Sequence, residues 1–208
     1  MIRPESPLVL GSASPRRRTI LAELGLPVRV AASGVPEPAW AGQHPEEYLE
    51  QVVGDKLAAV AALPLPDALG AVLVADTVVV VDDQLLGKPA SLPDAERLLT
   101  QLVGRTHQVY TRYAIASPEN VRVMAVGRTV VSDVTMRSAS DEEIARYAQT
   151  GEGLDKAGAY AVQGIGAFLV ERIAGSYTNV VGLPACEVVV DLSACGLLGP
   201  FPLCGHRS

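Results

Sequence analysis

The segment Val72-Leu-Val-Ala-Asp-Thr-Val-Val-Val-Val81 carries the strongest fold signal in the chain. Its nearly continuous run of aliphatic, mostly β-branched side chains is typical of a central strand that is buried on both faces of a sheet. Asp82-Asp83 predicts a turn, and Leu85-Leu86 begins a return strand. Asp76 interrupts the apolar run, so we expect a partly desolvated carboxylate that needs a cation or a metal ion beside it.

Strand and helix signals alternate along the rest of the chain. Apolar runs predict strands at residues 8–10, 28–32, 106–116 and 121–136, the last two as an antiparallel pair. Caps and apolar periodicity predict helices after Ser14, at 45–62, at 91–103, from the Ser140 capping box to near Gly151, and from Pro184 to about Leu192. The glycine-rich residues 154–182 indicate a mixture of strand and loop. This interleaving predicts an α/β fold.

Composition limits the class of protein. Of the 208 residues, 49% are hydrophobic and 19% are charged, which is enough for a core and too apolar for a disordered chain. The net charge of −6 disfavours a general nucleic-acid-binding protein but allows a local basic pocket. We expect one domain over residues 1–208, with an irregular tail at 197–208 whose apolar side chains either cover a surface or remain loose.

Targeting and redox signals point to a cytoplasmic protein. Two prolines and a glutamate within the first seven residues interrupt the apolar region that a signal peptide needs, and no apolar run is long enough for a membrane span. The cysteines at 186, 195 and 204 are odd in number and lack a CxxC spacing. We therefore expect a reduced protein without a membrane partner.

The segment Gly11-Ser-Ala-Ser-Pro-Arg-Arg-Arg18 places a loop and a helix start directly after the first strand. The N-terminus of a helix carries partial positive charge and favours acidic residues, yet three arginines occupy this first turn. These arginines cost free energy at the positive end of a helix. They become favourable when the loop binds an anion, because the helix dipole, the loop N–H groups and the guanidinium groups then all point at it. Successive helical residues lie about 100° apart, so at least one arginine is expected to be structural. The alternative is a solvated basic patch whose arginines reach distant carboxylates.

Two lysines are predicted near Asp76. With a two-residue turn at 82–83 the hairpin register places Lys88 opposite Thr77, and a three-residue turn places it opposite Val78. Lys56 lies on the apolar face of the helix expected at 45–62, so it points inward, either to a phosphate or to the edge of the apolar stripe. A carboxylate, a hydroxyl and ammonium groups in a dry site suit phosphoryl chemistry.

The ligand types favour a hard metal ion over zinc. The three histidines lie far apart in the sequence and show no zinc-binding spacing. Glu37, Asp76 and Asp155 offer oxygen ligands, which suit Mg²⁺ or Mn²⁺ carried in with the phosphates of a nucleotide.

Five motifs together resemble the Maf family of nucleoside triphosphate pyrophosphatases, also called septum formation inhibitors. They are the loop at 11–18, Ala-Asp-Thr-Val-Val at 75–79, Gly-Lys-Pro at 87–89, Asp-Lys-Ala-Gly-Ala-Tyr at 155–160 with Gln-Gly at 163–164, and Gly-Ser-Tyr-Thr-Asn-Val-Val-Gly-Leu-Pro at 175–184. They occur in the order of the family from Leu8 to about Leu192. The resemblance implies an elongated, mixed, twisted sheet flanked by helices, like the inosine triphosphate pyrophosphatases, with a nucleotide cleft between two lobes.

The resemblance also implies an activity and its residues. The reaction is hydrolysis of the α–β phosphate bond of a nucleoside triphosphate to the monophosphate and pyrophosphate, with a divalent metal ion. Asp76 matches the proposed proton acceptor and is, with Glu37, a candidate metal ligand. The residues expected to bind substrate are Ser12, Arg16, Arg17, Glu37, Lys56, Thr77, Lys88, Lys156 and Gln163. Arg16, Thr77 and Gln163 match the positions linked to base preference, and the combination is similar to the branch that prefers dTTP and UTP.

Further implications of the resemblance are house-cleaning of the nucleotide pool, including modified pyrimidine triphosphates, a role in cell-division arrest, and a homodimer. Two other classes stay open. A non-catalytic nucleotide-binding regulator of septation could use the same cradle, although a desolvated aspartate would repel its phosphates. A nucleotidyltransferase would share the phosphate-binding loop but usually needs a histidine pair there, and this loop has none.

Overall fold

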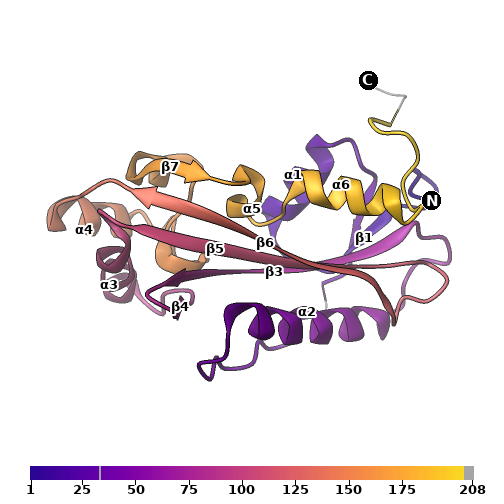
Figure 1. Cartoon of the computed structure of the whole chain (residues 1–208), viewed down its shortest axis with the longest axis horizontal. Coiled ribbons are helices and arrows are strands. Elements are labelled where there is room, and N and C mark those ends of the chain that lie inside the picture. Colours follow the sequence, from indigo (N-terminus) through magenta and orange to yellow (C-terminus); the bar gives the residue numbers. More distant parts are fainter. Residues whose placement is uncertain (33, 204–208) are drawn as a thin grey trace.

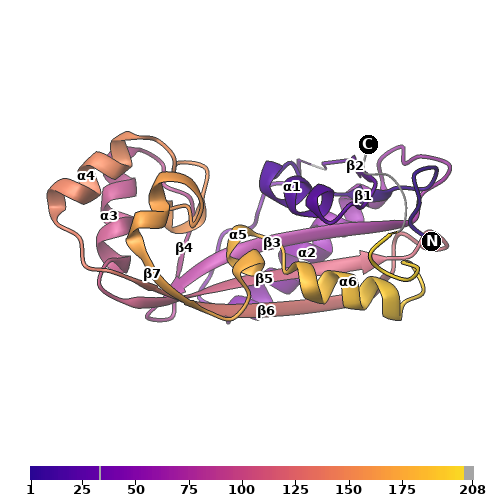
Figure 2. The ribbon, with the colours of Figure 1, turned by 90° about the horizontal axis from the view of Figure 1, so that it is seen from above.

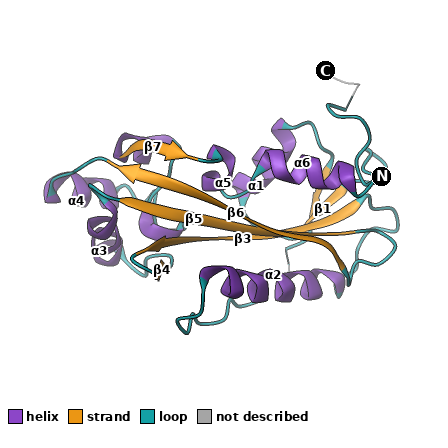
Figure 3. Cartoon of the chain, viewed as in Figure 1, coloured by secondary structure: helices purple, strands orange, loops and turns teal. Residues whose placement is uncertain are grey.

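The computed structural model describes residues 1–32 and 34–203. Its strands are β1 (Leu8–Leu10), β2 (Val28–Val30), β3 (Ala71–Val81), β4 (Gln84–Leu86), β5 (Thr106–Ala116), β6 (Met124–Met136) and β7 (Val170–Ala174) (Figures 1 and 3). Its helices are α1 (Pro15–Glu23), α2 (Pro45–Ala61), α3 (Leu92–Leu102), α4 (Asp141–Gln149), α5 (Tyr177–Val181) and α6 (Ala185–Ala194), with the 3₁₀ helices η1 (Ala157–Ala159) and η2 (Gly164–Leu169). The strands form one seven-stranded mixed sheet in the order β2-β1-β3-β5-β6-β7, with β4 paired to β3. The α/β class is confirmed.

Local sequence sets the starts of three helices. The Ser14 hydroxyl accepts the N–H of Arg17 at the start of α1, where Pro15 supplies the first helical residue. Ser91 caps α3 in the same way. Ser140 forms the predicted capping box of α4 with Glu143. These starts are confirmed because each depends on residues within one turn.

Strand β3 is the central strand of the sheet. All of its residues are buried except Thr77, which is half-buried. Alternate residues of β3 face opposite layers: Leu73 packs in a core with α1 and α6, whereas Val74 packs in a core with α2. Helix α2 therefore covers one face of the sheet, and α1, α5 and α6 cover the other (Figure 1).

Three strands, β3, β5 and β6, run along most of the length of the molecule. At one end they carry the cores against α1, α2 and α6, and at the other end they carry a separate core against α3 and α4 (Figure 2). All pairs among these three strands are antiparallel, whereas β1 is parallel to both β2 and β3. This arrangement confirms the predicted elongated mixed sheet with flanking helices.

One edge of β3 carries two short partners with a gap between them. Strand β1 pairs with β3 over Ala71–Leu73, and β4 pairs with it over Val79–Val81. Among the described strands, none pairs with this edge over residues 74–78. Asp76 lies at the middle of this gap, so the candidate site opens where the sheet is incomplete.

The region at 154–182 was only partly predicted. Instead of strand and loop alone, it contains η1, η2, β7 and the short helix α5. The Tyr-Thr-Asn-Val-Val sequence of α5 favours a strand by propensity. The helix forms because the Ser176 hydroxyl accepts the N–H of Asn179 at 3.2 Å and Gly182 ends the turn.

The C-terminal segment covers the core and does not remain loose. Leu197 and Leu198 are buried in the same apolar cluster as α1 and α6, and the N–H of Ile2 donates to the carbonyl of Leu197 at 2.7 Å. The rest of the predicted tail, residues 204–208 with Cys204, lies outside the described residues. None of the described helices has the length and apolar character that a membrane crossing requires.

Candidate functional site

A cavity of about 740 Å³ lies at the gap in the edge of β3. Its wall takes residues from the loop after β1, the middle of β3, the segment after β4, and the turns around η1 and η2. Every residue predicted for the site lines it: Ser12, Arg16, Arg17, Glu37, Lys56, Asp76, Thr77, Lys88, Lys156 and Gln163. The structure therefore brings together residues that are up to 151 positions apart in the chain.

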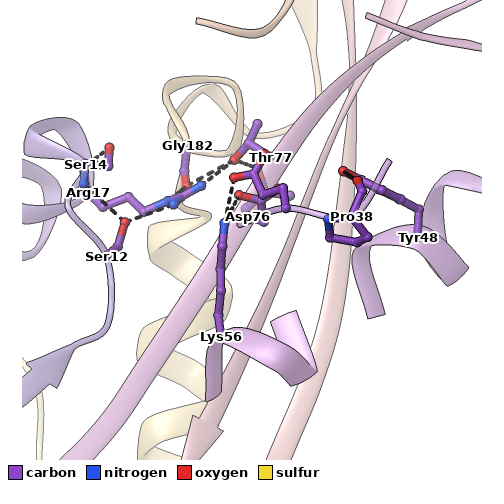
Figure 4. A network of polar contacts seen from close by, with 11 residues as sticks. Ser12, Ser14, Arg17, Pro38, Tyr48, Lys56, Asp76, Thr77 and Gly182 are labelled. Carbon is purple, nitrogen blue, oxygen red and sulfur yellow. Dashed lines mark hydrogen bonds and ion pairs between the residues drawn. The ribbon is translucent and has the colours of Figure 1, made fainter. Parts of the chain in front are cut away.

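Asp76 is buried in this wall and forms an ion pair with Lys56. Its residue exposure is 8%, and the Lys56 ammonium donates to Asp76 Oδ1 at 2.6 Å and to Glu37 Oε1 at 3.0 Å (Figure 4). Helix α2 presents Lys56 from its buried side, as its apolar periodicity predicted. The cation that compensates the buried carboxylate is thus Lys56.

Lys88 lies in the same cavity wall but outside the hairpin. Of the two turn lengths considered, the two-residue turn forms, because Val81 pairs with Gln84 and Val79 with Leu86. Pairing ends at Leu86, so the chain leaves β3 before Lys88 comes opposite Thr77. Lys88 is exposed and faces the cavity, where its charge helps to lower the pKa of Glu37.

Glu37 is ionised by its surroundings. Partial burial opposes ionisation, but the charge and hydrogen bond of Lys56, with weaker contributions from Lys88 and Arg17, hold the pKa of Glu37 below its ordinary value. Half of this side chain remains in contact with solvent. Glu37 therefore offers a carboxylate that is charged and accessible at neutral pH.

Arg17 is the structural member of the three arginines. Only 7% of the residue is exposed, and its guanidinium donates to the Gly182 carbonyl at 2.8 Å, to Ser12 Oγ at 3.0 Å and to Thr77 Oγ1 at 3.0 Å (Figure 4). Burial lowers the pKa of Arg17, with the Asp76 carboxylate opposing that shift. Among the described residues no carboxylate forms an ion pair with Arg17, so its charge adds to the positive field of the cavity.

The remaining arginines and Lys156 have different surroundings. Arg16 Nη1 lies 3.1 Å from Asp155 Oδ2, and Lys156 Nζ lies 2.5 Å from Asp155 Oδ1. Arg18 is exposed on α1. Asp155 is thus engaged with two cations and does not join Glu37 and Asp76, which corrects the expected trio of oxygen ligands.

Two carboxylates form the donor set that could hold a metal ion. Glu37 and Asp76 are neighbours because both bond the Lys56 ammonium, each through one oxygen, which leaves the second oxygen of each carboxylate for a metal ion. Within residues 1–32 and 34–203 no group of three or more His, Cys, Asp or Glu side chains is placed to bind a metal. A two-carboxylate set fits Mg²⁺ or Mn²⁺ that takes its other ligands from phosphates and water.

Sequence reasoning missed several residues of the wall, among them Tyr48, Glu152 and Tyr160. Tyr160 belongs to one of the quoted motifs, but its side chain gave no polar pattern that marked it as part of a site. Glu152 follows Gly151 in a turn and carries no spacing signal at all. Only the fold shows that these side chains reach the cavity.

Comparison with known proteins agrees with this geometry. The family model described as "Maf-like protein" matches residues 7–195, which include every predicted site residue. The chain is 45% identical over 192 residues to the "dTTP/UTP pyrophosphatase" of Geobacter sulfurreducens, covering 92% of this chain and 97% of that protein. It is 46% identical to the proteins of the same name from Geobacter metallireducens, over 93% of this chain and 98% of the relative, and from Myxococcus xanthus, over 94% of each. The chain therefore belongs to the Maf family.

Proposed function

We propose that this protein is a nucleoside triphosphate pyrophosphatase that hydrolyses dTTP and UTP to the monophosphate and pyrophosphate. The observation that carries the proposal is the buried Asp76 carboxylate in a cavity lined by five cationic side chains. A chain with a net charge of −6 concentrates positive charge at one place, which suits a ligand with several negative charges. The names of relatives at 45–46% identity support the choice of dTTP and UTP.

The basic side chains neutralise the triphosphate. Arg16, Lys88 and Lys156 line the opening from three separate segments, and Lys56 reaches in from α2. Phosphoryl transfer depends mainly on positioning and on stabilising charge that builds up on phosphate oxygens. These cations therefore supply the largest part of the expected rate enhancement.

Asp76 acts on the attacking water. A water molecule attacks the α-phosphorus, its oxygen forms the new P–O bond, and the bond between the α-phosphorus and the bridging oxygen breaks to release pyrophosphate. Asp76 orients this water and accepts its proton, which a buried carboxylate with one free oxygen can do. Lys56 fixes the other oxygen of Asp76 and keeps the carboxylate in place.

Glu37 and Asp76 would hold Mg²⁺ or Mn²⁺ that arrives with the phosphates. When bound, such an ion neutralises phosphate charge and polarises the scissile bond. The protein would contribute the oxygens of these two carboxylates that Lys56 does not engage, and the phosphates would supply remaining ligands.

Gln163 is the candidate reader of the base. Its side chain is exposed at the cavity wall, and its amide can donate and accept at once, which fits the N3–H and O4 edge of uracil or thymine. Thr77 contributes indirectly, because its hydroxyl is bonded to Arg17 and lies 2.9 Å from the hydroxyl of Thr111. Arg16 lines the same cavity from α1 and donates to Asp155 at 3.1 Å.

A pyrophosphate-release assay tests the proposal. The purified protein is given dTTP, UTP, dCTP, dATP and GTP, each with Mg²⁺ and with Mn²⁺. We expect release that is fastest for dTTP and UTP and that stops when the metal is chelated. Tight binding of these nucleotides without release would support a non-catalytic regulator instead, and transfer of the nucleotide to a second substrate would support a nucleotidyltransferase.

The cellular role follows from the same chemistry. Hydrolysis of dTTP, UTP or modified pyrimidine triphosphates would clean the nucleotide pool, and a role in cell-division arrest would act through it. Cys186 and Cys195 are exposed free thiols, which supports a reducing cytoplasm. The homodimer implied by the family resemblance is tested by light scattering of the purified protein.

A further inference from the structure

The segment that carries Gln163 is held at both of its ends by two side chains. At its start, the N–H of Ala161 donates to the hydroxyl of Tyr147 at 3.0 Å. At its end, the N–H groups of Ile165 and Gly166 donate to the two oxygens of Glu152 at 2.9 and 2.7 Å. The Tyr147 hydroxyl in turn donates to Glu152 at 2.9 Å, so both ends of the segment are joined through one connected group.

Tyr147 and Glu152 are themselves fixed by the fold. Tyr147 belongs to α4, is 2% exposed, and packs in the core of the α3–α4 end, with its ring edge-on to Phe168 at a centroid distance of 5.9 Å. Glu152 lies in the turn three residues after α4 ends. We call Tyr147 and Glu152 the clamp. The clamp fixes the segment at 161–166 in place relative to helix α4.

Two glycines show how closely the segment lies against the clamp. A Cβ atom at Gly164 would collide with the carboxylate of Glu152, and Gly164 also has a positive φ of 74°. A Cβ atom at Gly166 would collide with the hydroxyl of Tyr147. The clamp side chains take part of the space that a side chain would need at both positions, together with the Ala161 carbonyl at Gly166 and the positive φ at Gly164.

The Gln163 side chain lies between these anchor points and is free to bind a ligand. It is exposed at the cavity wall, and no hydrogen bond between described residues involves its amide. The backbone around Gln163 is thus fixed, while its side-chain amide has no hydrogen-bond partner among the described residues. This is the arrangement expected when a protein holds a specificity side chain ready for its ligand.

Glu152 lines the cavity but its carboxylate is already engaged. Its oxygens accept from two backbone N–H groups and one hydroxyl. Partial burial opposes ionisation, yet these hydrogen bonds and the charge of Lys156 hold the pKa of Glu152 below its ordinary value. A charged carboxylate with three donors is suited to hold a loop and poorly suited to act as a base or a metal ligand.

We propose that Tyr147 and Glu152 are positioning residues for base recognition, which hold the Gln163 amide against the pyrimidine edge of the nucleotide. This inference rests on the proposed function. It assigns the clamp to substrate discrimination and leaves the phosphate chemistry to Asp76 and the cations.

The variants Tyr147→Phe and Glu152→Gln test the inference. Tyr147→Phe keeps the ring in the core and removes the hydroxyl, and Glu152→Gln keeps the shape but turns an NH₂ group toward a backbone N–H. We expect the KM for dTTP and UTP to rise about fivefold to tenfold, with kcat changed less than about twofold and the preference over GTP reduced by a similar factor. Glu142→Gln, on the exposed side of α4, and the exposed Tyr177→Phe are matched controls that should change neither value.

A double-mutant cycle separates positioning from a general structural role. If the clamp acts through Gln163, then adding Tyr147→Phe to Gln163→Ala should not reduce base preference further. An equal additional loss in both backgrounds would overturn the proposal, and so would a lower melting temperature with base preference unchanged.

Binding of the non-hydrolysable analogue α,β-imido-UTP, compared with the GTP analogue by calorimetry, keeps the two proposals distinguishable. Absence of pyrophosphate release from every triphosphate would remove the proposed function. In that case a loss of base discrimination in binding by the clamp variants would still support the clamp, and unchanged discrimination would contradict it.

Discussion

Asp76 and Lys56 form the ion pair on which the proposed chemistry of this site depends. Their charged atoms lie 2.6 Å apart, and both side chains are largely buried. A buried ion pair contributes little net stability, whereas removing one partner leaves an uncompensated charge. The pair is therefore better explained by the need to hold a carboxylate beside phosphates than by the stability of the fold.

The substitution Asp76→Asn removes the proposed proton acceptor and keeps the shape of the side chain. We expect kcat for pyrophosphate release to fall by about 10²- to 10⁴-fold, because an amide cannot accept the proton of the attacking water. Steady-state kinetics with dTTP measures this. Asp83→Asn, at the exposed turn of the same hairpin, is the control and should keep full activity. Near-normal turnover of Asp76→Asn would remove Asp76 from the mechanism.

The substitution Lys56→Met leaves the buried carboxylate without its partner. We expect the free energy of unfolding to fall by about 3 kcal/mol, the low end for a broken buried pair, because some solvent reaches both groups. The double variant with Asp76→Asn should recover part of this loss, since the unpaired charge is then gone. Urea denaturation of the three proteins measures the effect, and equal losses in the single and double variants would contradict it.

The sequence predicted most residues of the site but few of their partners. Helical periodicity placed Lys56 on the inner side of its helix, whereas the predicted pairing of Lys88 with Thr77 or Val78 is wrong because β4 ends at Leu86. The sequence could not show that Arg17, and not Arg16, is the structural arginine. Helix geometry shows only that the two side chains point in different directions. Their partners, Asp155 for Arg16 and Gly182 for Arg17, come from distant segments of the chain. Glu152 could not be found, since its role depends on the return of residues 161–166 to α4.

At the scale of elements, a buried histidine joins the sheet to the wall of the cavity. His107 of β5 is 2% exposed, and its Nε2 lies 2.8 Å from the hydroxyl of Tyr160, which follows η1. The two rings meet edge-on with centroids 5.3 Å apart. Burial lowers the pKa of His107 to about 4, so the ring is neutral in the folded protein at pH 7.

Stability should therefore fall as the pH drops from about 6.5 toward 4. In this window the unfolded chain binds a proton at His107 and the folded chain does not, so protonation favours unfolding. The contribution of this one residue is on the order of 3 kcal/mol over the window. His107→Phe should be less stable at pH 7, because Tyr160 loses its partner, but its stability should depend less on pH.

The measurement is the free energy of unfolding at several pH values between 4 and 7 for both proteins. The difference between them isolates His107 from the carboxylates that also titrate there. Parallel curves for His107→Phe and the wild type would show that His107 is protonated in the folded state.

Three helices that begin at a clear serine cap were predicted, whereas helix α5 was not. Ser14, Ser91 and Ser140 each mark a helix that the structure contains. Helix α5 has β-branched residues that favour a strand, but its Ser176 cap, Gly182 and packing against β5 and β6 together give a helix. Local propensity loses where tertiary contacts decide the conformation.

At the scale of the whole molecule, the C-terminal segment closes the core beside the start of the chain. Leu197 and Leu198 are 5% and 4% exposed in a cluster that also contains Ile2 and residues of α1 and α6. The cluster lies on the face of the sheet opposite α2 (Figure 1). Neither Leu197 nor Leu198 lines the cavity, so we expect this segment to act on the stability of the fold.

Leu198→Ala should destabilise the protein without changing its chemistry. Shortening the Leu198 side chain should lower the free energy of unfolding by about 2 to 4 kcal/mol, because apolar contacts are lost and a void remains in the core. At a temperature where the variant is folded, kcat and KM for dTTP should equal those of the wild type. Val123→Ala, 57% exposed, is the control and should alter neither property. A large loss of kcat in folded Leu198→Ala would link this segment to the site.

The class of the whole fold was predictable, whereas the opening in the sheet was not. Interleaved strand and helix signals indicated an α/β protein, and the central strand was found from its apolar run. The lengths of β1 and β4 decide that residues 74–78 lack a neighbour on one edge. A pattern of side chains does not set where pairing stops, because hydrogen-bond partners come from elsewhere in the chain.

The continuity of the long strands limits how the protein can respond to its ligand. Strand β5 stays paired with β3 from Val72 to Val80, and both ends of the molecule are built on this same ladder. A hinge needs a few residues that can change their backbone angles, and a paired ladder does not supply them. We therefore expect the two ends of the molecule to keep much the same relative orientation when a nucleotide binds. Adjustment to the ligand falls to side chains and surface loops, so the protein would choose its substrate by the fit of a preformed opening.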